Sequence, residues 1–140
     1  MRNSCPGRTH RLALFFTLAC AALAGCRGTP AYQGNQRDIL ATFRFRRLCA
    51  DLPATVRVPA AVAASKAALL GRGYTIQSAT ATEDSGHVDA APADAAMLES
   101  ISVDIRQTPS ATRIQIIAEP IGSQSRSRAI LDAILSNLGL

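Results

Sequence analysis

The sequence lacks the motifs that most often reveal an enzyme's chemistry. It contains no G-x-S-x-G turn for a serine nucleophile, no phosphate-binding glycine loop and no dinucleotide-binding glycine pattern. Only two of its 140 residues are histidines and four are cysteines, and tryptophan is absent. Few side chains are therefore available for nucleophilic, acid–base or metal chemistry, and we expect no catalytic residues, no metal and no cofactor.

The first 25 residues have the pattern of an export signal. Residues 1–11 contain three arginines and no acidic residue, and residues 12–24 form an apolar run that only Thr17 interrupts. A basic start, a short apolar segment and small residues at its end are typical of a signal peptide. The run is shorter than the roughly 20 residues that a membrane-spanning helix needs, so we do not expect a permanent transmembrane segment.

The apolar run ends in Leu23-Ala24-Gly25-Cys26. This segment resembles the lipobox of bacterial lipoproteins, in which an aliphatic residue and two small residues precede a cysteine that is lipidated and becomes the new N-terminus. The resemblance predicts cleavage after residue 25 and membrane attachment through lipid on Cys26. An ordinary secretory signal that happens to contain Cys26 is the alternative.

The residue after the cysteine is Arg27 rather than the aspartate that commonly retains such proteins at the inner membrane. The resemblance therefore implies a lipoprotein of the bacterial cell envelope that faces the periplasm, at the outer membrane if the source has two membranes.

Removal of residues 1–25 would leave little charge and a single thiol. Three of the 15 basic residues lie in that segment, so 12 would remain against 10 acidic residues, a net charge of about +2. Nucleic-acid binding usually needs a dense basic face, and we expect none here. Cys5 and Cys20 would be removed and Cys26 would carry lipid, which leaves Cys49. We interpret Cys49 as buried and inert rather than paired with another molecule.

Residues 26–38 are polar and contain glycine and proline, so we expect a lipidated N-terminus followed by a flexible tether. Residues 39–140 are expected to form a single domain. Within it, residues 39–50 fit both a helical and a strand spacing, and periodicity does not decide between them.

The rest of the domain predicts an α+β fold, a small antiparallel sheet with two helices packed on one face. Residues 60–71 are rich in alanine and leucine and predict a helix. Apolar residues alternate with polar ones in residues 100–107 and 112–118, which predicts a hairpin. The last helix is expected after a cap at Ser123 or Ser125. The remaining expected strands are residues 55–58, 74–82 and 87–90, with a turn at 83–86.

Three segments occur in an order that resembles an uncharacterised family of small bacterial lipoproteins. They are Ala67–Tyr74, the hairpin Ile101–Ile117 and the segment Ile121–Ile134, and the likeness covers most of residues 59–138. It implies a fold and an envelope location but no catalytic residue, and Ser123 departs from the acidic residue often found there. By element order alone the chain is also similar to helix-grip domains of outer-membrane assembly lipoproteins.

His87, the single histidine outside the signal, has acidic neighbours at Asp84 and Asp89. His87 and Asp89 are two residues apart and could share one face of a strand, and Ser85 beside them suggests a hydrolytic triad. A zinc site needs three or four ligands, and a triad needs an oxyanion site that no motif here supplies. We interpret this segment as a solvated turn.

Arg44, Arg46 and Arg47 lie close to the expected tether, and Arg126 and Arg128 begin the last helix. The first group is a candidate for contact with anionic lipid headgroups, although three arginines are fewer than the four to eight typical of a lipid-binding patch. A solvated face is the alternative.

These observations favour a non-enzymatic envelope module that binds or supports another envelope component. The partners expected are the membrane, through lipid on Cys26, and an envelope protein. A component of an envelope or outer-membrane assembly complex is the second hypothesis, and a small hydrolase or ligand carrier is the third.

Overall fold

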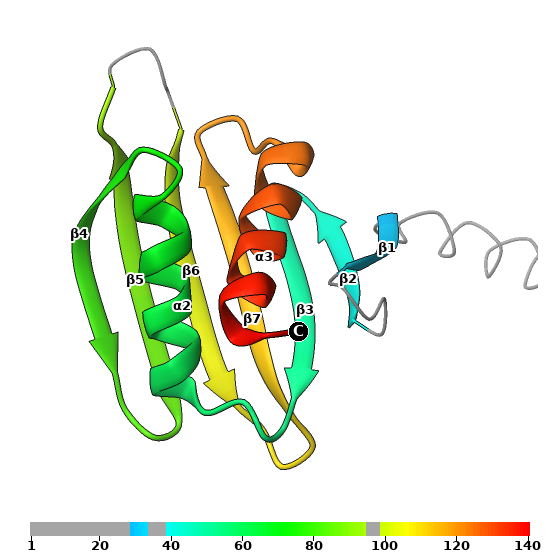
Figure 1. Cartoon of the computed structure of the whole chain (residues 1–140). Coiled ribbons are helices and arrows are strands. Elements are labelled where there is room, and N and C mark those ends of the chain that lie inside the picture. Colours follow the sequence, from blue (N-terminus) through cyan, green and yellow to red (C-terminus); the bar gives the residue numbers. More distant parts are fainter. Residues whose placement is uncertain (1–28, 34–38, 95–98) are drawn as a thin grey trace, which may run out of the picture.

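The computed structural model describes residues 29–33, 39–94 and 99–140, which form one antiparallel sheet of seven strands with two helices on one face (Figure 1). The predicted α+β fold is therefore confirmed. The signal peptide expected at residues 1–25 and Cys26 lie outside the described residues. The elements are β1 (Thr29–Gln33), β2 (Ile39–Arg44), β3 (Arg47–Pro53), α2 (Val58–Leu70), β4 (Tyr74–Ala81), β5 (Ser85–Pro92), β6 (Ser100–Gln107), β7 (Ala111–Glu119) and α3 (Gln124–Leu138).

The strand order in the sheet is β1-β2-β3-β7-β6-β5-β4, so β1 and β4 are the two edges. The predicted hairpin is present as β6 and β7, with Val103 opposite Ile116. The region 39–50 consists of two strands, β2 and β3. They are joined by Phe45 and Arg46, whose φ angles of 46° and 68° are those of a two-residue hairpin turn with both central residues left-handed.

Two expected elements differ from the structure. Thr29–Gln33 was expected within the tether, but its backbone pairs with β2, and the buried Gln33 donates from Nε2 to the Arg128 carbonyl at 3.4 Å. The sheet thus begins at Thr29, before the domain boundary expected at residue 39. Residues 55–58, expected as a strand, form a turn and the start of α2, because Pro59 suits the first turn of a helix.

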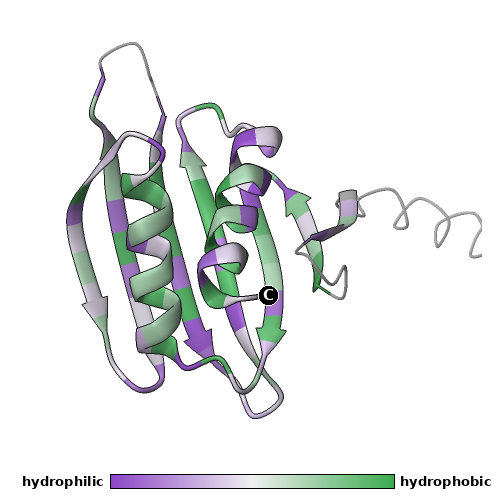
Figure 2. Cartoon of the chain, viewed as in Figure 1, coloured by the Kyte–Doolittle hydropathy of each residue, from purple (hydrophilic) through white to green (hydrophobic). Residues whose placement is uncertain are grey.

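The core lies between the sheet and the two helices. Apolar side chains that alternate along β6 and β7 point inward, and the stripe of α3 meets them, with Ile130, Leu131, Ile134 and Leu135 fully buried. Of the two possible caps, Ser123 is the one used, since its side chain accepts a hydrogen bond from the Arg126 amide at 3.3 Å. Figure 2 shows the resulting contrast on α3 between apolar and polar residues.

Helix α2 is apolar nearly all round, and Lys66 is its single charged residue (Figure 2). It packs very close to β5 at Gly86, where an added Cβ would lie 2.4 Å from Cγ2 of Val62 and 3.0 Å from Cγ1 of Val58. Glycine is therefore required at this contact. No helix among the described residues is long and apolar enough to cross a membrane.

Both helices lie on the same face, and no helix of the described residues covers the other. That second surface, here called the open face, carries the polar residues of the alternating strands. The open face and the ends of the strands are therefore where a functional surface must be sought.

Candidate functional site

The turn between β2 and β3 brings two of the three candidate headgroup-binding arginines together. Arg44 and Arg47 are the last facing pair of the two strands, and Phe45 and Arg46 form the turn between them. We call residues 44–47 the hairpin tip. The Arg44 guanidinium carbon lies 5.3 Å from the centre of the Phe45 ring, within the range of a cation–π contact. All four residues are exposed.

Arg46, in contrast, is engaged with the loop between β7 and α3. Its guanidinium donates to the Pro120 carbonyl at 2.8 Å, and its own carbonyl accepts from the Ala118 amide at 3.3 Å. Gly122 packs so closely that an added Cβ would lie 2.3 Å from Cγ of Arg46. Arg46 therefore joins the hairpin tip to this loop, whereas the guanidinium groups of Arg44 and Arg47 make no hydrogen bond or ion pair with the described residues.

The basic pair at the start of α3 is also engaged in internal contacts. Arg126 donates to the buried carboxylate of Glu99 at 2.7 Å, and the Arg128 carbonyl accepts from Gln33. These interactions hold α3 to the sheet. We therefore assign Arg126 and Arg128 a structural role.

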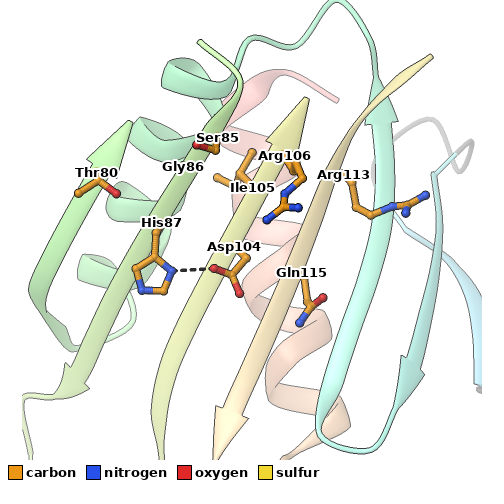
Figure 3. Close-up of a pocket in the computed structure, with 9 residues that line it drawn as sticks. All are labelled: Thr80, Ser85, Gly86, His87, Asp104, Ile105, Arg106, Arg113 and Gln115. Carbon is orange, nitrogen blue, oxygen red and sulfur yellow. Dashed lines mark hydrogen bonds and ion pairs between the residues drawn. The ribbon is translucent and has the colours of Figure 1, made fainter. Parts of the chain in front are cut away.

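His87 lies in β5 and on the open face, in agreement with the strand expected at residues 87–90, and its interpretation as part of a solvated turn is wrong. Asp104 of β6 stands directly opposite it, and Asp89 follows two residues along β5. The ring's Nδ1 lies 2.7 Å from Oδ1 of Asp104, and its Nε2 lies 2.8 Å from Oδ2 of Asp89. Figure 3 shows the bond to Asp104, with the helices behind the sheet. The spacing of two did place His87 and Asp89 on one face.

This arrangement favours the doubly protonated imidazolium, because a carboxylate can only accept and both ring nitrogens face one. The hydrogen bond to Asp104, followed by that to Asp89, raises the pKa of His87 above its ordinary 6.5. A hydrogen bond from Ser102, at 2.7 Å, and then His87 lower the pKa of Asp89. With both ring nitrogens hydrogen-bonded to carboxylates, His87 is poorly placed to act as a general base toward a bound substrate.

The candidate triad is not assembled. The Ser85 hydroxyl is 3.1 Å from the Thr82 hydroxyl, with which it shares a hydrogen bond, and the structure shows no bond between Ser85 and His87. Within the described residues, no group of three or more His, Cys, Asp or Glu side chains is placed to hold a metal ion.

A half-open cavity of about 570 Å³ lies over the open face beside His87, lined also by Thr80, Arg106 and Gln115 (Figure 3). Arg106 and Arg113 face each other across β6 and β7, an unfavourable pairing of like charges. Arg113 forms a two-point ion pair with Asp51 at 2.8 and 3.2 Å, which raises the pKa of Arg113. Arg106 makes no ion pair with the described residues. Its guanidinium is therefore available to an acidic group of a partner.

Cys49 is half-buried on the open face, opposite Gln115 of β7 and Thr42 of β2. Burial raises the pKa of its thiol, and this outweighs the opposing effect of the nearby arginines 113 and 47. A thiol with a raised pKa is a poor nucleophile at neutral pH. The interpretation of Cys49 as an inert residue fits this environment.

Sequence reasoning missed Asp104 and Arg106, because strand register alone brings them to His87 and Arg113. No protein-family model matches this chain, and no curated protein matches it either.

Proposed function

We propose that this chain is a lipid-anchored module of the bacterial envelope that binds another envelope component and is not an enzyme. The lipobox-like segment that ends at Cys26, only three residues before the first strand, carries this proposal. Three residues span at most about 11 Å, so lipid on Cys26 would hold the sheet directly at the bilayer. With Arg27 after the cysteine, we propose the periplasmic side of the outer membrane as its location.

The open face is the surface best suited to a protein partner. It extends across the strands without a covering helix in the described part of the chain, and its polar residues include the unpaired Arg106 and the ion-paired Arg113. The adjoining cavity adds hydrogen-bonding groups from Thr80 and Gln115. An acidic, hydrogen-bonding segment of an envelope protein complements this surface. Catalysis has little support, because His87 is held between two carboxylates.

Site-specific photocrosslinking in living cells tests this assignment. A photoreactive residue at Gln115, on the open face, should give a discrete crosslinked species, whereas one at the exposed Ala63 of α2 should not. The species should disappear with Arg106→Glu and persist with Arg57→Glu, an exposed arginine just before α2. Equal crosslinking from Gln115 and Ala63 would reject the open face as the binding surface.

The second candidate, a component of an envelope assembly complex, is favoured by the edge strand β4. Its residues Tyr74–Ala81 include no charge and no proline, and nearly all are exposed. Exposed edge strands normally carry charged residues or proline, which prevent pairing with other chains. An edge without these residues can accept an added strand. A bulge between Ile76 and Ser78 is the one irregularity of this edge.

Ala79→Lys would place a charge on the β4 edge, and Ala63→Lys provides a matched control on α2. If β4 is the binding edge, Ala79→Lys should abolish recovery of the assembly complex in a mild-detergent pull-down while Ala63→Lys leaves it intact. Equal recovery with both variants would exclude this role.

A further inference from the structure

Phe45 and Ile121 are the most exposed large hydrophobic side chains of the described residues, at 76% and 72%. They are distant in sequence but belong to two loops that are in contact. Phe45 precedes Arg46, and Ile121 lies between Pro120 and Gly122, both of which contact Arg46. Two exposed apolar side chains are thus presented at the same end of the sheet.

The surrounding contacts hold this end in a defined shape. Phe45 and Arg46 occupy the left-handed turn, and the Arg46 side chain bonds to the neighbouring loop at 2.8 Å. Gly122, with a φ of 79°, packs against the Arg46 backbone and leaves no room for a side chain. Because the shape is formed before any partner binds, little conformational entropy remains to be lost on binding.

Positive charge flanks the apolar pair. Arg44 and Arg47 face each other at the base of the turn, and neither forms an ion pair with the described residues. Glu119, the last residue of β7, is an exposed carboxylate at this end, so the net charge of this end is modest. An amphipathic end of this kind, with apolar side chains at its extremity and guanidinium groups beside them, matches the boundary between lipid headgroups and acyl chains.

The first strand, β1, begins at this same end of the sheet. Strands β1 and β2 are antiparallel, and Thr29 pairs with Phe43, so β1 begins beside the hairpin tip. Cys26 is three residues before Thr29 in the sequence, and a chain of that length spans at most about 11 Å. Lipid on that residue would bring this end, rather than the opposite end of the strands, to the bilayer.

We propose that the hairpin tip and Ile121 form a membrane-docking surface, in which Phe45 and Ile121 enter the bilayer interface while Arg44 and Arg47 bind phosphate groups of anionic phospholipids. This inference rests on the proposed lipid anchor at Cys26. Several acyl chains already hold such a protein firmly, so the docking surface sets its orientation rather than its affinity. The sheet then stands on its end, and the open face remains in water where a partner can reach it.

The absence of tryptophan allows a direct test, because Phe45→Trp creates a single tryptophan that can be excited apart from the two tyrosines. The full-length, lipidated protein is reconstituted into vesicles of phosphatidylcholine and phosphatidylglycerol with brominated acyl chains. The control is Ser110→Trp, in the exposed β6–β7 turn at the opposite end of the strands. We expect a blue-shifted emission and at least threefold stronger bromine quenching for Phe45→Trp than for Ser110→Trp. Adding Ile121→Ser to Phe45→Trp should reduce the quenching.

The contribution of the arginines is measured by adding Arg44→Gln and Arg47→Gln to the Phe45→Trp protein. Quenching should fall in vesicles that contain phosphatidylglycerol, down to the level seen in pure phosphatidylcholine. Equal quenching of Phe45→Trp and Ser110→Trp, in protein whose mass shows acylated Cys26, would overturn the docking surface and leave the anchor intact. Missing acyl mass on Cys26 would overturn the anchor and the proposed function with it.

Discussion

Gly86 gives the sharpest test of how α2 packs on the sheet. In Gly86→Ala the new methyl group would lie 2.4 Å from Cγ2 of Val62 and 3.0 Å from Cγ1 of Val58. Carbon atoms in contact prefer about 3.5–4.0 Å, so a shift on the order of 1 Å is required. Both neighbours are β-branched and strongly restricted at χ1 in a helix. The strain therefore has to be relieved by moving α2 itself.

Overpacking of this kind typically costs about 1–3 kcal/mol. Replacing glycine by alanine also stabilises the native state by about 0.4–1 kcal/mol, because the unfolded chain loses conformational freedom. We expect Gly86→Ala to lower the free energy of unfolding by about 1–2 kcal/mol. In a domain near this size, each kcal/mol lost lowers the melting temperature by roughly 4–8 °C. Urea and thermal denaturation followed by circular dichroism measure both quantities.

Val62→Ala removes both γ-methyl groups of Val62, including the one with the closest contact, and supplies a double-mutant cycle. Alone it should destabilise the fold, since each buried methyl-sized group contributes about 0.8 kcal/mol. Combined with Gly86→Ala, the total loss should be smaller than the sum of the two by about 1 kcal/mol. Gly71→Ala is the control, because its Cβ would approach only Ala67 and Ala68 carbonyl oxygens, at 3.3 and 3.8 Å. Additive effects, or a Gly86→Ala protein as stable as wild type, would refute this packing.

Three further predictions concern the core and the open face. Leu131→Ala should lower the free energy of unfolding by about 2–5 kcal/mol because Leu131 is fully buried, whereas Ser136→Ala on the exposed side of α3 should change it little. Equal melting temperatures for the two variants would contradict the packing of α3. The pKa of His87 is raised above 6.5, so the stability it adds should be complete below that pH and lost as the pH rises through the folded-state pKa. Urea titrations across pH 5–9 should show this fall in the free energy of unfolding, and His87→Gln or Asp104→Asn should reduce it. Cys49→Ser and His87→Ala should each complement a deletion strain if folded, and a folded variant that fails would reinstate a chemical role.

Helices and strands whose apolar residues recur at a regular spacing could be predicted from the sequence. Residues 100–107 alternate between apolar and polar, and the side chains of Ile101 and Val103 are buried as this period requires. The apolar stripe of α3 could be predicted for the same reason, because its residues recur at helical spacing. Strand β1 could not, because Thr29–Gln33 contains a proline and no alternation, and it is a strand only through its pairing with β2.

The candidate sites could be predicted only in part from the sequence. A spacing of two residues placed His87 and Asp89 on one face, but Asp104 reaches His87 through the register between β5 and β6, which local sequence does not specify. Likewise, the arginines of the hairpin tip were visible as a cluster. Their association with Ile121 depends on the contact between two loops that are far apart in the chain. A site that tertiary contacts assemble cannot be predicted from local sequence patterns.

Intact mass spectrometry of the protein purified from bacterial membranes tests most directly whether lipid on Cys26 holds this domain at a membrane. The proposal predicts an N-terminus at Cys26 that carries the mass of a diacylglyceryl group, and an unprocessed precursor for Cys26→Ala. A mature N-terminus at another residue, or an unmodified Cys26, would contradict the claim.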